Sequence, residues 1–500
     1  MSPRLTKRKG FSRSVLLYGV VLLYWLTRLI NLDSLAFFID EANHMWWARW
    51  VWELHPFLAA SDGRLLNVLW MAAFWPFNAG VWLPRASVVL VTTAGLACTL
   101  AFTHRLISLR AAVVAGLLYT FLPLTFFFER MALADSISAP FVAGALWCIA
   151  RFYSLHSPVT PLVTKDRVFW AALGGLALTA AIFSKISNLI FLGIPAAAAV
   201  ILFKPAEWRR AALLVVVMYA GCFLTLAPSA WVVKVVGQQS DLGLDLLNFK
   251  TQVTLAQLPQ QIKSAGLIVM NHAASFIPFP MWLIILIGIA IALWRGGRPA
   301  WFVTAVLAAT VAALMGRTSP AYLQSRFLPV YAPMVAIAAG AGLAYLAAKW
   351  KPIWLAVGGV ALLGSGFVFA WRGWTQPTTL SLPLEDRWQY ITGWPSGYGF
   401  REIAENVIAR DEPATLVTLD LGGQERFDGY LLGRIDKVTA KQYRPGMSLT
   451  NVLLVIDTPK DDQDLAAMNL TLTEIARYPR PDGESALVVY RVTPPPSPHP

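Results

Sequence analysis

The sequence predicts a polytopic α-helical membrane protein that ends in a small α/β domain. Of its 500 residues, 57% are hydrophobic and only 14% are charged, whereas a soluble domain carries about 25% charged residues. About eleven apolar stretches reach the length of roughly 17–22 residues that is needed to cross a bilayer. The last quarter of the chain changes character, with short strand-like runs between polar helical stretches.

The predicted spans alternate with connectors of two kinds. We place the spans at about 14–31, 84–103, 111–128, 136–153, 168–184, 188–203, 211–233, 278–294, 299–315, 327–347 and 353–371. Every second connector is short and rich in Lys and Arg, which predicts that it faces the cytoplasm. The N-terminus is then cytoplasmic and, with an odd number of spans, the C-terminal domain lies outside. We therefore expect a multi-pass protein of the bacterial inner (plasma) membrane.

The domain boundaries follow from this topology. Residues 1–375 are predicted to form the transmembrane catalytic domain, with two long outside connectors at 32–83 and 234–277. Residues 376–492 form the extracytoplasmic α/β domain, and the proline-rich residues 493–500 a disordered tail. In the α/β domain we expect strands at Thr415–Leu419, Val452–Ile456 and Ala486–Tyr490, and helices at Arg401–Arg410 and Asp462–Met468.

The excess of positive charge does not indicate nucleic-acid binding. The formal net charge is +13 and the pI about 9.7, but the basic residues are dispersed between spans and form no stripe. Cytoplasmic loops and anionic lipid head groups explain such charge better. Cys98, Cys148 and Cys222 fall within apolar runs with no metal-ligand spacing, so we interpret them as small buried side chains.

The first outside connector contains Asp40 and Glu41 at the start of a Trp-rich interfacial helix. One interpretation is structural, because an acid at the N-cap and another in the first turn stabilise a helix. The alternative is chemical, because the membrane part has few acids and these two lie at the bilayer surface. His44 shares a helix face with Asp40, so the pair could bind a divalent cation. No third ligand is evident, and no metal site or firm cofactor is assigned.

Other ionisable residues fall in the remaining outside connectors. They are Arg64 before a second short helix, Glu129, Arg130 and Asp135 in one tight turn, Lys185 in a hairpin, and Arg326 before the tenth span. Local salt bridges, snorkelling or interfacial anchoring could explain each of them alone. The topology, however, puts all of them on one face of the membrane. Fixed cations suit a phosphate, and a carboxylate suits deprotonation of a hydroxyl.

Four segments resemble a known family. They are Phe38-Ile-Asp40-Glu41-Ala42, Glu129-Arg-Met-Ala-Leu-Ala-Asp135-Ser136, Ser184-Lys185, and Ser325-Arg326-Phe-Leu-Pro-Val-Tyr331. Their order is similar to that in the GT-C membrane glycosyltransferases, in the superfamily of protein O-mannosyltransferases and lipid A aminoarabinose transferases. The tail segment from Gly393 to Glu402 also resembles tails of bacterial members. The sequence departs from many members at 61–66, where it has Ser-Asp-Gly-Arg-Leu-Leu in place of a Lys-Pro-Pro-like stretch.

The resemblance implies an inverting transfer of a sugar from a polyprenyl-phosphate donor. It implies a catalytic Asp40, with Glu41 in a supporting, helix-orienting role and Asp135 as a second catalytic candidate. The donor phosphate would be bound by Arg64, Arg130, Lys185 and Arg326, and His44, Glu129 and Tyr331 would line the substrate pocket. The acceptor could be a lipid, a glycan or a protein, and the sequence names neither it nor the sugar. A transporter or lipid flippase, or a non-catalytic scaffold, remains the alternative.

Overall fold

The computed structural model describes residues 3–56, 64–74, 80–155, 161–236, 256–318, 323–350, 352–410, 412–419, 422–431, 437–468 and 470–493. Residues 61–63 of the divergent stretch, most of the second long connector, and the proline-rich end lie outside the described residues. The chain divides into two compact units. The first comprises Met1–Ile30, Pro56–Asn67 and Val88–Arg372, and the second Asn31–His55, Val68–Ser87 and Gly373–Pro500. Each unit is described by itself.

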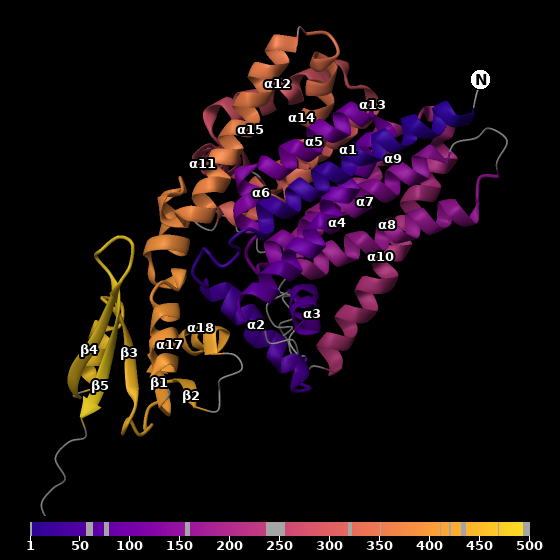
Figure 1. Cartoon of the computed structure of the whole chain (residues 1–500). Coiled ribbons are helices and arrows are strands. Elements are labelled where there is room, and N and C mark those ends of the chain that lie inside the picture. Colours follow the sequence, from indigo (N-terminus) through magenta and orange to yellow (C-terminus); the bar gives the residue numbers. More distant parts are fainter. Residues whose placement is uncertain are drawn as a thin grey trace, which may run out of the picture. The chain divides into compact units, whose positions relative to one another are not determined.

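The first unit is a helical bundle (Figure 1). Its helices are α1 (Pro3–Leu29), most of α4 (Trp82–Leu106), α5 (Leu109–Phe121), α6 (Pro123–Phe128), α7 (Ala134–Ser154), α8 (Lys165–Ser184), α9 (Ile194–Leu202), α10 (Trp208–Val236), α11 (Leu258–Phe276), α12 (Phe279–Arg295), α13 (Gly297–Arg317), α14 (Ala332–Ala347) and most of α15 (Pro352–Thr375). The 3-10 helices η3 (Ile186–Gly193), η7 (Ser325–Phe327) and η8 (Pro329–Tyr331) join them.

Six segments of the described residues are long and apolar enough to cross a membrane. They are Trp82–Leu106, Ala134–Ser154, Lys165–Ser184, Pro205–Pro228, Gly297–Gly316 and Ser325–Ala347. Several shorter apolar helices lie beside them. The prediction of a polytopic helical protein with a small C-terminal sheet is therefore confirmed, whereas the number of eleven spans stays a prediction.

Two predicted segments differ from the structure for identifiable reasons. The apolar run at 111–128 is not one helix, because α5 ends at Phe121 and α6 begins at Pro123. A residue that precedes proline avoids the helical region, and Leu122 accordingly has an extended backbone (φ −65°, ψ 120°). The connector predicted at 234–277 contains α11, a helix whose polar residues hid its apolar face of Ala265, Ala273 and Phe276.

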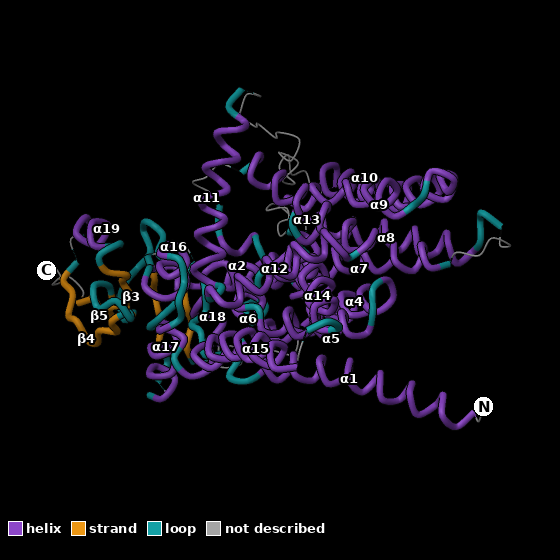
Figure 2. Tube along the Cα trace, turned by 90° about the horizontal axis from the view of Figure 1, so that it is seen from above, coloured by secondary structure: helices purple, strands orange, loops and turns teal. Residues whose placement is uncertain are grey.

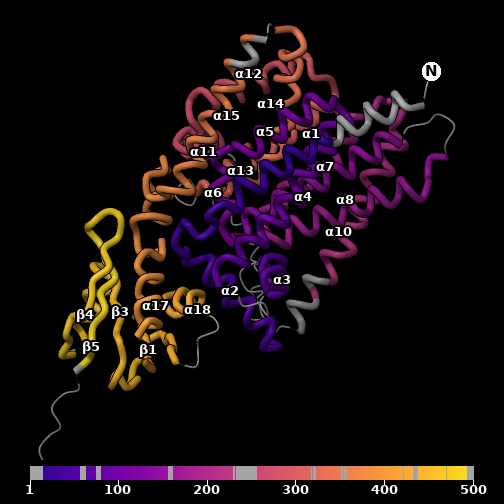
Figure 3. The backbone as a smooth tube through the Cα atoms, viewed as in Figure 1, coloured from indigo at the N-terminus to yellow at the C-terminus, as the bar shows by residue number. Residues whose placement is uncertain are grey.

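Close helix packing positions the bundle. Helix α7 packs on α8, α8 on α10, and α14 on both α5 and α12. These helices are labelled along the backbone trace of Figure 3. Gly288 of α12 faces Gly342 of α14, and a Cβ atom on Gly342 would collide with the Gly288 carbonyl. Small residues at such crossings allow two helix backbones to approach closely.

The second unit is built on a five-stranded sheet of order β2-β1-β3-β5-β4 (orange in Figure 2). The strands are β1 (Ala414–Thr418), β2 (Val438–Gln442), β3 (Leu453–Thr458), β4 (Thr471–Pro479) and β5 (Ala486–Thr493). Strands β2, β1 and β3 are parallel, and β5 pairs antiparallel with β3 and β4. The three predicted strands are found. The edge strands β2 and β4 were missed because polar and charged residues dilute their alternation.

Part of the first connector belongs to the same unit as the tail. Helix α2 (Ile39–Trp52) packs on α18 (Gly423–Leu431), beside α17 (Phe400–Ala409). The Phe37 and Tyr430 rings meet edge to face at 5.9 Å, and the Phe37 amide donates a hydrogen bond to the Tyr430 hydroxyl at 3.0 Å. Residues 31–55 and 68–87 therefore belong to the same compact unit as the tail, whereas the predicted domain of residues 376–492 contained neither segment.

Candidate functional site

The first unit brings Asp135 and Lys185 together at the ends of two helices. Asp135 lies in the first turn of α7, after the extended Leu133, where a helix N-terminus favours a carboxylate. Lys185 ends α8 in an extended conformation (φ −160°, ψ 121°), so its side chain leaves the helix axis. The Lys185 ammonium donates a hydrogen bond to Asp135 Oδ1, and both side chains are largely buried.

Two arginines join this pair. Arg326 and Arg64 both lie close enough to act electrostatically on Lys185 and on Asp135. The centre of the Phe327 ring lies 3.7 Å from Lys185 Nζ and 6.0 Å from Arg326 Cζ. An aromatic face stabilises a cation that has been taken out of water. Four of the predicted site residues are thus clustered, and Phe327 is an addition.

A small pocket of ≈ 300 Å³ opens at this cluster. Its lining includes Asp135, Lys185, Arg326, Tyr331, Ser138, Ser187 and Asn188. The buried Tyr331 hydroxyl donates to the Thr310 carbonyl at 3.3 Å, and its ring packs on Phe191 at 5.8 Å. The sequence predicted Tyr331 as a lining residue but missed the polar Ser138, Ser187 and Asn188. The only sequence signal for the last two was their place directly after Lys185.

Glu129 occupies a different, closed environment. Its carboxylate accepts hydrogen bonds from Tyr119 (2.6 Å), Tyr24 (2.9 Å) and Arg28 Nε (3.1 Å). Glu129, Arg28 and both tyrosines are completely or almost completely buried. Glu129 does form an ion pair, but its cation is Arg28 of α1 and not the neighbouring Arg130, so the pair is not the local salt bridge considered for this turn. These contacts give Glu129 a structural role, and its predicted place in a substrate pocket stays untested.

The Arg130 side chain points toward the backbone at the C-terminal end of α1. Its Nη2 donates to the Ile30 carbonyl at 3.0 Å, and its guanidinium lies 4.8 Å from the Phe126 ring centre. Among the described residues that line the Asp135 pocket, Arg130 does not occur. Its role as a phosphate ligand therefore remains a prediction without geometric support from this pocket.

In the second unit, Glu41 accounts for the start of α2. The N-cap is Phe38, not Asp40, and the Phe38 amide donates to Glu41 Oε2 at 3.2 Å. Arg85 forms a bidentate ion pair with the same carboxylate at 2.9 and 2.8 Å. Arg85 also donates to the carbonyls of the turn before the helix, those of Leu32, Leu35 and Ala36. Glu41 and Arg85 are fully buried, which fits the helix-orienting role expected of Glu41.

Asp40 differs from Glu41 in its exposure. It lies in the first turn of α2, is half-buried and is not the N-cap, although an acid in the first turn still stabilises a helix. His44, one turn further on, is buried with its ring 5.6 Å from that of Trp47. Within the part of the chain that the structure describes, no three His, Cys, Asp or Glu side chains form a group that could bind a metal ion.

Burial shifts the pKa of several titratable groups of the tail. Burial raises the pKa of Tyr430, whose hydroxyl accepts the Phe37 hydrogen bond. Burial also raises the pKa of Tyr398 to about 12. The pKa of Asp428, on α18, is raised to about 6 by burial, against the opposing effect of Arg49 on α2. None of these groups was indicated by the sequence.

The fold is that of GT-C glycosyltransferases. ArnT from Cupriavidus metallidurans, crystallised with undecaprenyl phosphate, matches with a TM-score of 0.57 at 16% identity, over 95% of this chain and 97% of that one. The archaeal oligosaccharyltransferase AglB from Archaeoglobus fulgidus, in complex with an inhibitory peptide and a dolichol-phosphate, matches with a TM-score of 0.52 at 12% identity, over 98% and 75%. No protein-family model and no curated sequence matches the chain. At identities this low, the structural matches establish the shared fold alone. The resemblance suggested by the four motifs is confirmed at the level of the fold.

Proposed function

We propose that this protein is an inverting glycosyltransferase that moves a sugar from a polyprenyl-phosphate donor to an acceptor on the outer face of the cytoplasmic membrane. The observation that carries the proposal is the cluster of Lys185, Arg326 and Arg64 around Asp135. Counted over these four described residues, three formal positive charges and one negative charge leave a surplus of two. That surplus suits a phosphate better than any neutral substrate.

The charge surplus also suits the change that the phosphate undergoes. A sugar-linked phosphodiester carries about one negative charge, whereas the departing monoester carries about −1.5 to −2 at neutral pH. Cations fixed beside it therefore stabilise the transition state more than the bound donor. Because the phosphate leaves as a stable anion, no general acid is required.

The remaining chemistry is a single displacement. The acceptor hydroxyl oxygen bonds to the anomeric carbon, the bond from that carbon to the phosphate oxygen breaks, and its electron pair leaves with the phosphate. The hydroxyl proton passes to a carboxylate, which we assign to Asp40 because it is the half-buried acid of the first turn of α2. One base suffices for inversion, in contrast to the two carboxyl groups of a retaining enzyme.

The test combines a substrate panel with one substitution. Purified protein in nanodiscs is incubated with a panel of polyprenyl-phosphate sugars and candidate acceptors, and transfer is followed by mass spectrometry. Asp40→Asn keeps the size of the side chain but cannot accept a proton, so turnover should fall about 100-fold or more while donor binding persists. Glu53→Gln, in an exposed pair with Arg49 at the other end of α2, is the matched control.

Each outcome has a distinct meaning. Full turnover by Asp40→Asn would remove Asp40 as the base and transfer that role to Asp135. Binding of lipid-linked sugars without transfer, together with movement of the lipid between leaflets, would replace the transferase by a flippase.

A further inference from the structure

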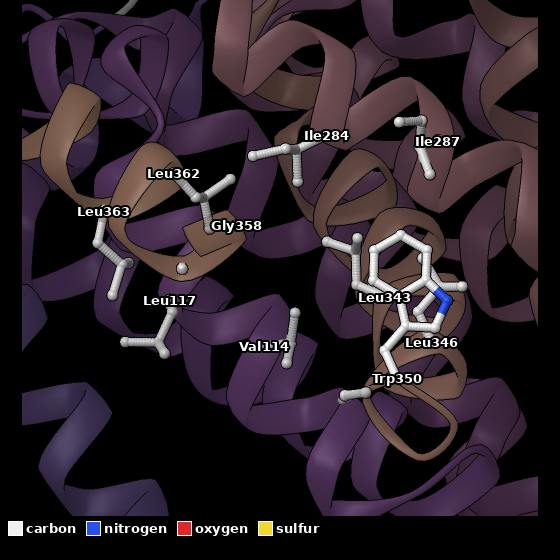
Figure 4. Close-up of a pocket in the computed structure, with 12 residues that line it drawn as sticks. Val114, Leu117, Ile284, Ile287, Leu343, Leu346, Trp350, Gly358, Leu362 and Leu363 are labelled. Atoms are coloured by element: carbon white, nitrogen blue, oxygen red, sulfur yellow. The ribbon is translucent and has the colours of Figure 1, made fainter. Parts of the chain in front are cut away.

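A second hollow of the first unit lies at the opposite end of α14 from Arg326. It contains ≈ 890 Å³ of space and is lined by Val114, Leu117, Ile284, Ile287, Leu343, Leu346, Ala347, Trp350, Gly358, Gly359, Leu362 and Leu363. Figure 4 shows Leu362 and Leu363 facing Leu343, Leu346 and Trp350 across the open space. Four helices, α5, α12, α14 and α15, form its walls, and every lining side chain except the Trp350 indole is purely hydrocarbon. We call this hollow the α14–α15 groove.

The groove passes over two glycines of α15. A Cβ atom added to Gly358 or Gly359 would meet nothing within 4 Å, although both residues lie inside α15, where glycine costs about 1 kcal/mol relative to alanine. Their neighbours Val357 and Val360 are 53% and 73% exposed. This side of α15 therefore borders the exterior of an apolar bundle, where the surrounding solvent is hydrocarbon.

Cations lie at one end of the groove. Arg295 ends α12, with its guanidinium 4.2 Å from the Trp294 ring centre. Lys349 adjoins Trp350, and its ammonium lies 4.9 Å from the ring centre of Tyr345. Ala292 of α12 lies against Gly342 of α14, and Arg295 and Tyr345 each lie three residues further along these helices. Both cations are therefore near Tyr345. No acidic side chain lines the groove among the residues that the structure describes.

The spacing fits one leaflet of a bilayer. Ile284 and Ile287 precede Arg295 by eleven and eight residues, which is about 16 and 12 Å along a helix. Half of a bilayer's hydrocarbon core is about 15 Å thick. A lipid whose phosphate lies at Arg295 would therefore have its acyl chain alongside these isoleucines.

We propose that the α14–α15 groove binds one acyl chain of an anionic glycerophospholipid whose phosphate contacts Arg295 and Lys349. Apolar burial alone does not select an occupant, because bilayer hydrocarbon is as apolar as the groove. The two cations provide the selection, since a Lys or Arg near a charged lipid head group favours it. Helix α14 spans about 24 Å, so this head-group site is separate from the cation cluster at Arg326. The proposal does not depend on the proposed glycosyl transfer.

The test is lipid binding by native mass spectrometry. Delipidated full-length protein is titrated with phosphatidylglycerol and, separately, with phosphatidylcholine of identical chains. We expect phosphatidylglycerol to bind roughly 30-fold more tightly, because each of the two cations contributes roughly fivefold. The double variant Arg295→Gln/Lys349→Gln should abolish this preference and leave phosphatidylcholine binding unchanged.

A second pair of variants tests the groove itself. Gly359→Leu should fill the groove and weaken binding of both lipids at least about tenfold, since a site occupied by a side chain excludes the chain. Gly364→Leu is the matched control, because it lies on the same helix, also meets nothing within 4 Å, and does not line the groove. Ile287→Phe fills the groove from the opposite wall if Gly359→Leu fails to fold.

Three results would overturn the proposal. They are equal affinity for the two lipids, unchanged affinity in both Gly359→Leu and Ile287→Phe, and displacement of phosphatidylglycerol by undecaprenyl phosphate at equal concentration. The last result would assign the groove to a prenyl chain.

Discussion

Glu129 and Asp135 lie at the two ends of one short connector between α6 and α7, yet their surroundings are opposite. Glu129 is buried and receives hydrogen bonds from a guanidinium and two phenols. Asp135 contacts Lys185 and lines a pocket with Arg326. A buried carboxylate that is bound by three donors stabilises the fold, whereas one that lines a pocket beside several cations is available for chemistry.

The contrast locates function more sharply than residue type does. Both acids are buried and both have a basic partner from a distant helix, so neither burial nor ion pairing separates them. The two acids differ instead in the net charge around them and in the presence of a pocket beside Asp135. Around Glu129 one cation balances one carboxylate, whereas three cations surround Asp135.

The largest expected effect is on folding. Glu129→Gln leaves Arg28 buried at 0% exposure without its counter-charge, which costs about 3–5 kcal/mol. We expect a large drop in the thermal transition of the detergent-solubilised protein. Glu207→Gln, in a surface pair with Arg210, should leave it unchanged. A Glu129→Gln protein that is stable but unable to bind donor would instead put Glu129 in the site.

The second prediction concerns donor binding at the other end of the connector. Arg326→Ala removes a charged hydrogen-bond donor, which is worth about 1.5–3 kcal/mol or roughly 10–100-fold in affinity. Equilibrium binding of a polyprenyl-phosphate sugar measures this, with Arg209→Ala at an exposed position as the control. Arg326→Lys should recover part of the affinity, because it restores the charge but not the bidentate geometry. Wild-type affinity in Arg326→Ala would exclude the cluster as the phosphate site.

The third prediction is an increase in affinity, in contrast to the decrease expected for Arg326→Ala. Asp135→Asn removes the negative charge beside Lys185, so the cluster becomes more positive by one unit. The product, polyprenyl phosphate, should then bind more tightly, by about fivefold for a screened charge at this range. Competition between product and labelled donor measures the change. Weaker product binding would indicate that Asp135 positions Lys185 and that the neutral variant loses this orientation.

The sequence predicted the two ends of this connector unequally. Asp135, Lys185 and Arg326 could be grouped because alternating loop charge places helix ends on one side of a membrane. Arg28 could not be assigned to Glu129, because it lies within the first predicted span, 101 residues away, and nothing local indicates which helix faces it. Arg85 was missed as the partner of Glu41 for the same reason, since it lies at the start of the second predicted span. Composition alone predicts which helix ends lie on the same side of the membrane. The side-chain partners between distant helices depend on how the helices pack, which the sequence does not show directly.

The last prediction uses Asp428, an acid of the second unit that resembles neither case. It has a side-chain hydrogen bond from Gln424 and the more distant charge of Arg49, and burial outweighs both, so its pKa is raised from 3.8 to about 6. The folded state then binds more protons than the unfolded state between about pH 4 and 6. Stability from this group is complete below pH 4 and is lost as the pH rises through 6.

Asp428→Asn mimics the neutral form, so it should equal the wild type near pH 4 and melt higher above pH 6.5. For a partly exposed, screened site we expect about 1 kcal/mol, or roughly 2–4 °C in the thermal transition of the second unit. Glu474→Gln, in an exposed pair on β4, should show no such pH dependence. A lower melting temperature for Asp428→Asn at pH 7.5 would mean that the attraction to Arg49 exceeds the cost of burial, and would place Asp428 with the paired acids.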